Sequence, residues 1–187
     1  MKLAICMYGS IRTFVDPDLR EKYKQNFVSS ISNLGDYEVF VLLIRQVNGL
    51  NHISRLNDHC ALTEQELEVM LIDIFGKKPK HFEIDENNDR LPIESPHGKQ
   101  LWGIDKVFGI ANKYCEFDFF VRIRPDFYWH KSFDHTVLNH THVVTAIKSD
   151  APASDMFFIL SKQLYDDWWV KTIPQKIRTV NGPIEYI

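Results

Sequence analysis

Apolar residues along the chain alternate between short continuous runs and helical stripes, a pattern typical of an α/β protein. Residues 2–8 and 37–44 are dense in apolar side chains, as expected for strands buried on both faces of a parallel sheet. Between them, Asp16 and Pro17 form a helix start, and apolar residues recur on one helical face until Gly35. Strand, helix and strand in this order predict a crossover between parallel strands. The recurring apolar residues are Leu19, Tyr23, Phe27 and Ile31.

The rest of the chain continues this alternation. Thr63 and Glu66 form a capping box before a helix that Gly76 ends, and a helical stripe runs from Leu101 to Cys115. Further strands are expected at residues 80–84, 117–123, 143–147 and 156–160, and a last helix at 161–171 with Leu164, Trp168 and Thr172 facing inward. Residues 45–61 and 85–98 are expected to be loops. Together these elements predict one α/β domain over residues 1–187, with a mostly parallel central sheet flanked by helices.

Composition and charge exclude several classes of protein. Hydrophobic residues make up 44% and charged residues 25% of the 187, which is typical of a globular chain and not of a disordered or collagenous one. The 22 basic and 25 acidic side chains leave a net charge of −3, so no global attraction to nucleic acid is expected. No apolar run is long enough for a membrane span. Three widely spaced cysteines favour a reducing, cytoplasmic location.

Two polar segments follow predicted strands, at residues 8–12 and 122–126. Ligands of open α/β sheets bind beyond the carboxyl ends of the strands, so these two segments are expected to face one another. In the first segment, Gly9 lets the backbone approach a ligand closely, Ser10 offers a hydroxyl, and Arg12 offers a guanidinium that pairs with phosphate. Any anion that this protein binds is expected to be held here.

The second segment adds two cations and a carboxylate. Arg122 and Arg124 lie two residues apart, and Asp126 follows Pro125. Mg²⁺ and Mn²⁺ commonly bind one or two carboxylates and complete their coordination with water and substrate phosphate, so Asp126 suffices in principle as a metal ligand. The alternative is that Arg122 or Arg124 forms a structural ion pair with Asp126 or with Asp118. The pattern by itself leaves both open.

Four segments together resemble a family of small GT-A-type glycosyltransferases. They are residues 5–13, the helix at 100–106 with Trp102 and Lys106, residues 119–126 with the sequence RxRPD, and residues 154–158. The resemblance covers about residues 1 to 170, and the RxRPD element is its most specific part. Similar small domains are encoded by bacteria and by large algal viruses, and for a viral gene the location would be the host cytoplasm. The resemblance implies a GT-A-like, Rossmann-like fold and a role in glycan biosynthesis.

The resemblance also implies a reaction and a set of site residues. A sugar would pass from a nucleotide-diphosphate-sugar donor to a hydroxyl of a glycan or glycoprotein acceptor, with Mn²⁺ or Mg²⁺ bound by Asp126. Arg124 stands where many GT-A enzymes have the first Asp of an Asp-x-Asp motif, and would neutralise charge on the leaving diphosphate as a catalytic residue. The Tyr8 ring would stack on the base. The donor would be bound by Tyr8, Gly9, Ser10, Arg12, Lys106 and Arg122.

A second catalytic carboxylate is expected near the acceptor. Asp155 directly precedes an apolar strand and matches the position of such a residue in the family, although an ordinary turn aspartate is the alternative. Glu185 is a second candidate for the base. Residues 172–187 leave little room for an acceptor site, so we expect either a minimal enzyme or the first domain of a longer protein. A non-catalytic donor-binding module and, less favoured, a phosphohydrolase are the alternative functions.

Overall fold

The computed structural model describes residues 1–11, 16–45, 62–85, 96–132, 138, 144–145 and 157–179. Within these residues the strands are β1 (Lys2–Ser10), β2 (Asp36–Ile44), β3 (His81–Asp85), β4 (Phe119–Ile123), β5 (Val144–Thr145) and β6 (Phe157–Ser161). The helices are α1 (Pro17–Lys22), η2 (Tyr23–Val28), α2 (Ser29–Ser32), α3 (Glu64–Phe75), α4 (Pro96–Tyr114), α5 (Lys162–Leu164), η6 (Tyr165–Trp169) and α6 (Val170–Thr179). The segments η2 and η6 are π-helical.

The described strands form one six-stranded sheet in the order β3-β2-β1-β4-β6-β5. Strands β3, β2, β1 and β4 are parallel, β6 is antiparallel to β4, and β5 is antiparallel to β6. The prediction of an α/β fold with a mostly parallel sheet flanked by helices is therefore confirmed. Chain order along the sheet reverses at β1, because β2 lies on one side of β1 and β4 on the other. This reversal is the topological switch point at which open α/β sheets bind ligands.

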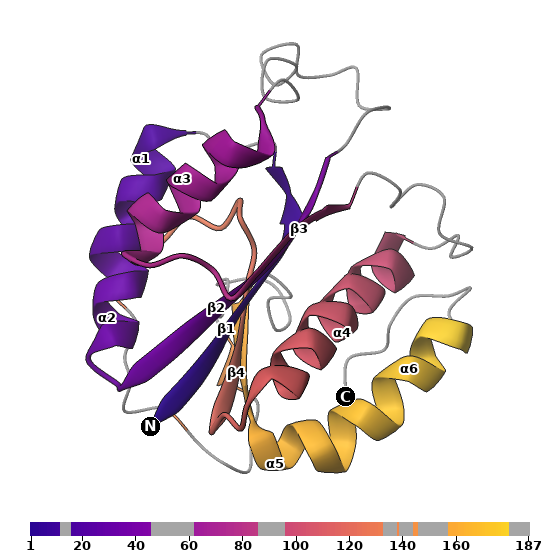
Figure 1. The fold of residues 1–187 in the computed structure, drawn as a ribbon. Coiled ribbons are helices and arrows are strands. Elements are labelled where there is room, and N and C mark those ends of the chain that lie inside the picture. The colour runs from indigo at the N-terminus through magenta and orange to yellow at the C-terminus, as the bar shows by residue number, and fades with distance from the viewer. Residues whose placement is uncertain are drawn as a thin grey trace.

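Helices cover both faces of the sheet (Figure 1). On one face lie α1, η2, α2 and α3, and on the other lie α4, α5, η6 and α6. Side chains of the central strands alternate between the two layers: Leu3, Ile5 and Met7 of β1 pack on the first face, and Cys6 and Tyr8 on the second. All five are at most 2% exposed. Strand β1 is buried on both faces, as its apolar run predicts.

The first helical stretch begins as predicted and then widens. Asp16 caps α1 by accepting a hydrogen bond from the backbone N–H of Asp18 at 2.9 Å, and Pro17 is the first helical residue. The inward-facing residues recur at steps of four, and in a regular α-helix such a stripe drifts by about 40° per step. The wider turns of η2 offset this drift, so the stripe keeps facing the sheet. Its buried members are Leu19, Tyr23, Phe27 and Ile31.

The capping box before α3 is present as predicted. The Thr63 side chain accepts from the backbone N–H of Glu66, and the Glu66 carboxylate accepts from the backbone N–H of Thr63 at 2.8 Å. The helix ends at Gly76, whose φ of 67° lies in the left-handed region that glycine adopts without strain. Both ends of α3 thus follow from local sequence alone.

The inward face predicted for the last helix is wrong by one position. The buried residues are Tyr165, Trp169 and Ile173, whereas Trp168 is 36% exposed. Leu164 is half-buried at the end of α5, where its backbone N–H donates to the Ser161 side chain. Aromatic residues at both 168 and 169 made the face ambiguous, and packing on Phe108 of α4 decides for Trp169, whose ring centroid lies 5.0 Å from that of Phe108.

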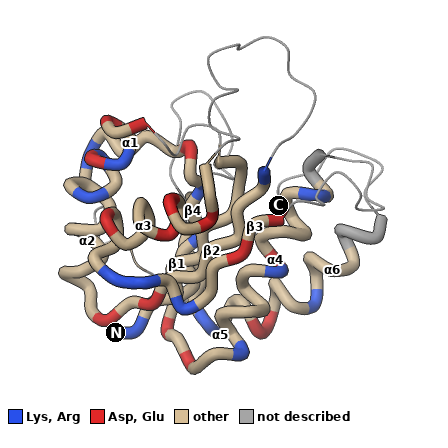
Figure 2. Tube along the Cα trace, turned by 45° about the horizontal axis from the view of Figure 1, so that its top comes forward, with Lys and Arg blue, Asp and Glu red and all other residues tan. Residues whose placement is uncertain are grey.

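Charges of both signs are interspersed on the described helices (Figure 2). On α1, Asp18 is followed by Arg20 and Lys22, and Lys162 near the start of the last helical stretch forms an ion pair with Asp166. No helix among the described residues is both long and apolar enough to cross a membrane.

Asp105 of α4 supplies a pH-dependent term in stability. Its carboxylate accepts a hydrogen bond from the indole N–H of Trp169 at 3.0 Å. Burial raises the pKa of Asp105 above the usual 3.8, and the hydrogen bond from Trp169 opposes this rise only in part. Because the folded-state pKa exceeds the unfolded one, this group favours folding most below pH 3.8 and loses that contribution as pH rises through the folded-state pKa.

We therefore expect Asp105→Asn to be more stable than the wild type at pH 7, because the amide oxygen still accepts from Trp169 while the buried charge is removed. The difference should shrink as the pH falls toward 3.8. Urea unfolding at pH 7 and at pH 4 measures it, with Asp167→Asn at an exposed position as the control. A difference that does not change with pH would contradict this explanation.

Candidate functional site

The carboxyl ends of β1 and β4 lie next to each other at the switch point. The two strands pair in parallel, and β4 ends at Ile123, opposite Met7. The residues that follow β4 therefore lie beside the last residues of β1, with Pro125 next to Gly9. The described part of the first polar segment, residues 8–10, therefore meets the second polar segment at one place in the fold. The first contributes Tyr8, Gly9 and Ser10 as the last residues of β1.

Gly9 is the point of closest approach between the two segments. A Cβ atom added to Gly9 would lie 2.8 Å from Cδ of Pro125, and the φ of Gly9 is +152°. Both facts exclude a side chain here without movement of the backbone or of the proline ring. The bare backbone of β1 thus lets the RxRPD segment pack directly on the strand end, with Pro125 buried.

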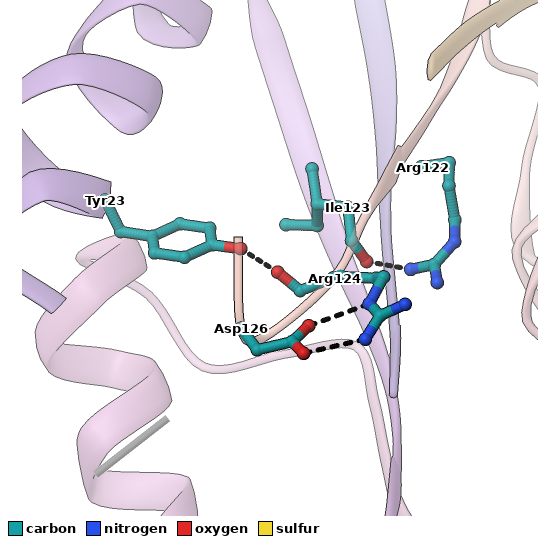
Figure 3. Close-up of polar contacts among 5 residues, drawn as sticks. All are labelled: Tyr23, Arg122, Ile123, Arg124 and Asp126. Carbon is teal, nitrogen blue, oxygen red and sulfur yellow. Dashed lines mark hydrogen bonds and ion pairs between the residues drawn. The ribbon is translucent and has the colours of Figure 1, made fainter. Parts of the chain in front are cut away.

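After β4 the chain reverses in a turn, and Tyr23 of the helical segment η2 holds this turn by a hydrogen bond. The backbone N–H of Phe127 donates to the carbonyl of Arg124 at 3.3 Å, the pattern of a β-turn with Pro125 at its second position. The same carbonyl accepts a hydrogen bond from the hydroxyl of Tyr23 in η2 (Figure 3). Burial raises the pKa of the Tyr23 hydroxyl far above its usual range, so the hydroxyl keeps its proton and stays a donor.

The two charged side chains of the turn bind each other. Arg124 donates through Nε to Oδ1 of Asp126 and through Nη2 to Oδ2, each at 2.7 Å. The Arg124 side chain is 20% exposed and that of Asp126 is 10% exposed. Of the ion pairs that the sequence left open, the pair of Arg124 with Asp126 is present. Asp118, directly before β4, accepts a hydrogen bond from the backbone N–H of Lys2 in β1.

Arg122 is completely buried beneath this turn. Its guanidinium donates to the carbonyl of Ile123, and its Cζ lies 5.6 Å from the centroid of the Tyr8 ring, within the range of a cation–π interaction. Burial raises the pKa of the neighbouring Cys6 thiol, and the charge of Arg122 opposes that rise. Arg122 thus adds positive potential from within the protein.

The Tyr8 ring is part of the hydrophobic core between the sheet and α4. It is 2% exposed, and its hydroxyl donates to the carbonyl of Lys99 at 3.2 Å. A Cβ on Gly103 would lie 1.9 Å from a ring atom, so the ring packs directly on the backbone of α4. Gly103 makes this close packing possible. Tyr8 therefore joins β1 and α4 beside the site, and stacking of its ring on a base stays a prediction.

Lys106 lies on the β3 side of the sheet. Its ammonium forms an ion pair with Glu83 of β3 at 2.5 Å and lies 5.2 Å from the centroid of the Trp102 ring. Burial alone would raise the pKa of Glu83, but hydrogen bonds and charges from Lys106 and His81 outweigh it and lower the pKa. Strand β3 is three strand spacings from β4, roughly 14 Å. The structure thus gives Lys106 a partner away from the turn.

Two predicted site residues, Arg12 and Asp155, lie outside the described residues, as does Glu185. The pocket role of Arg12 and the catalytic role of Asp155 therefore stay predictions. Ser10 is the last residue of β1 and is half-buried.

Asp126 as it stands is poorly suited to a divalent cation. Both carboxylate oxygens accept from Arg124, and no group of three or more His, Cys, Asp or Glu side chains suited to a metal occurs in the described parts of the chain. A metal ion bound to Asp126 would lie close to the positive guanidinium of Arg124. Like unit charges about 4 Å apart repel by about 4 kcal/mol at an effective dielectric constant of ~20, and a divalent ion doubles this. Binding of Mn²⁺ or Mg²⁺ by Asp126 stays a prediction.

Tyr23 is the site residue that sequence reasoning missed. The four-residue spacing identified it only as a core-facing position. A tyrosine in an otherwise apolar stripe carries a signal, however, because a buried hydroxyl needs a hydrogen-bond partner. The partner, the carbonyl of Arg124, lies 101 residues further along the chain, so the sequence pattern did not reveal it.

Fold and site together define an α/β protein with arginines gathered at the switch point of a mostly parallel sheet. No protein-family model matches the chain, and no curated protein matches it in a sequence search.

We expect Gly9→Ala to lower the free energy of unfolding by about 1–3 kcal/mol, because the new methyl group overlaps Pro125 and the backbone is strained. Gly109→Ala is the matched control, since a Cβ there meets nothing within 4 Å in the middle of α4, and it should stabilise by about 0.5–1 kcal/mol. Urea unfolding measures both, and a loss of equal size in the two variants would contradict the assigned contact.

We expect Tyr23→Phe to cost about 0.5–1.5 kcal/mol of stability and to shift the NMR resonance of the Arg124 Nε–H group, because the turn loses one of its restraints. Tyr37→Phe removes a similar hydrogen bond, from the Tyr37 hydroxyl to the carbonyl of Phe75, and should cost about as much without moving that resonance. An unchanged Arg124 resonance in Tyr23→Phe would show that the hydroxyl does not position the turn.

Proposed function

We propose that this protein is a GT-A-type glycosyltransferase that transfers a sugar from a nucleotide-diphosphate-sugar donor to a hydroxyl of a glycan or glycoprotein. The observation that carries the proposal is the meeting of the β1 end with the RxRPD turn at the switch point. Gly9 and Arg124, both from motifs that resemble this family, come together there although 115 positions separate them in the sequence. Ligand binding at such a point is the general rule for open α/β sheets.

The charges at this point suit a diphosphate leaving group. Arg122, Arg124 and Asp126 together carry one net positive charge, held by the fold on a protein whose net charge is −3. In the transfer, the bond between the anomeric carbon and the diphosphate oxygen breaks, and its electron pair leaves with the nucleoside diphosphate. The acceptor hydroxyl oxygen forms the new bond to carbon and gives its proton to a base, for which Asp155 is the candidate. Preorganised cations favour the step because negative charge develops on the leaving oxygen.

A donor-binding module without transferase activity is the second candidate. One observation favours it: both carboxylate oxygens of Asp126, the expected metal ligand, are paired with Arg124. The two candidates differ in whether the bound donor is consumed.

The test is a thermal-shift screen of nucleotide sugars, with Mn²⁺ and separately with a chelator, followed by measurement of nucleoside diphosphate release. At about 100 times Kd a ligand adds about 2.7 kcal/mol, which raises the Tm of a chain of this size by roughly 5–10 °C. We expect one donor to raise Tm, and its slow hydrolysis or transfer to release nucleoside diphosphate. The matching sugar 1-phosphate, which lacks the nucleoside monophosphate part of the donor, is the control. Absence of any shift would overturn the proposal, whereas a shift without turnover would favour the binding module.

A further inference from the structure

We propose that Arg124, oriented by Asp126, binds the diphosphate of the donor in the place that a divalent cation holds in enzymes with an Asp-x-Asp motif. This inference rests on the proposed function and concerns how the same site neutralises its ligand. It assigns Asp126 to the support of an arginine and not to a metal ion.

The pairing geometry is the first argument. Two parallel hydrogen bonds of 2.7 Å use both oxygens of Asp126 and the Nε edge of Arg124. Bidentate pairs of this kind fix the plane of the guanidinium as well as its position. Figure 3 shows the other terminal nitrogen of Arg124 directed away from Asp126. The carboxylate thus holds one edge of the guanidinium and orients the rest of it.

Exposure decides which of the two side chains meets a ligand. Arg124 is twice as exposed as Asp126, 20% against 10%. A ligand that approaches the turn therefore encounters more of the Arg124 side chain than of the Asp126 side chain. An anion is attracted by the guanidinium, whereas a cation that binds the carboxylate has to lie beside this positive charge. Guanidinium groups match phosphate geometry, which makes a diphosphate a suitable ligand.

The backbone of Arg124 is held before any ligand arrives. The Tyr23 hydroxyl and the Phe127 N–H both donate to its carbonyl, and Pro125 is packed on Gly9. Arg122 lies buried behind the turn and adds a second positive charge. A preorganised cation loses little side-chain freedom on binding, which favours affinity.

The experiment is isothermal titration calorimetry of the full chain with inorganic pyrophosphate and with UDP, GDP and ADP, in EDTA and separately in Mn²⁺. We expect pyrophosphate and at least one nucleoside diphosphate to bind in EDTA, with Kd changing less than threefold in Mn²⁺. Arg124→Lys should weaken this binding at least tenfold, because an ammonium cannot reproduce the bidentate fork. Asp126→Asn should weaken it by less, since the amide oxygen still accepts one hydrogen bond from Arg124.

The matched controls make the same two substitutions, Arg to Lys and Asp to Asn, at positions away from the turn. Arg20→Lys on α1 and Asp73→Asn, which breaks the surface ion pair with Lys24, should leave Kd unchanged. If Arg124→Lys does not fold, the NMR resonance of Arg124 Nε–H in the wild type replaces it, and pyrophosphate in EDTA should shift that resonance. An unshifted resonance at saturating pyrophosphate would overturn the inference.

The outcomes separate this inference from the proposed function. Binding of nucleoside diphosphate only in Mn²⁺, lost in Asp126→Asn and retained in Arg124→Lys, would make Asp126 a metal ligand and overturn the inference while the proposed function stands. Metal-free binding of pyrophosphate without binding of any nucleotide or nucleotide sugar would overturn the proposed function and leave the anion site of Arg124 supported. Absence of binding by every probe would overturn both.

Discussion

The parallel pairing of β1 with β4 is the constraint on which the rest of the structure depends. It places two strands that are more than 100 residues apart in the sequence side by side at the centre of the sheet. Both strands are buried on both faces, so their side chains link the two helical layers. The same pairing brings Gly9 beneath Pro125 and so creates the strand-end site. Fold and site therefore share one origin.

Around that pairing, the Arg122 side chain and the Arg124 backbone are held by contacts on opposite faces of the sheet. Arg122 faces α4 through the Tyr8 ring, and the carbonyl of Arg124 faces η2 through Tyr23. The aromatic cluster of Tyr23, Phe27 and Trp129 packs behind the turn, with the Phe27 and Trp129 rings stacked at 4.6 Å. The packing of the protein thus holds two arginines at the switch point, although the net charge of the chain is −3.

Much of the fold could be predicted from the sequence, because its cues are local. The cap at Asp16, the capping box at Thr63 and the left-handed Gly76 each depend on residues within one turn of helix. The inward face of the last helix could not be predicted, since Trp168 and Trp169 are equivalent in pattern and only packing on Phe108 separates them. The antiparallel direction of β6 was likewise not predicted, because apolar alternation is the same in either direction.

For the site, the sequence by itself determined which residues stand after the two central strands: Gly9 after one, and Arg122, Arg124 and Asp126 at the end of the other. Only the tertiary structure decided how they pair. Two residues apart, Arg124 and Asp126 are compatible both with an ion pair and with a metal site. The structure shows the ion pair, in the turn whose Arg124 carbonyl accepts a hydrogen bond from Tyr23. Long-range packing sets this geometry, because the free energy of placing a charge depends on neighbours that chain order does not specify.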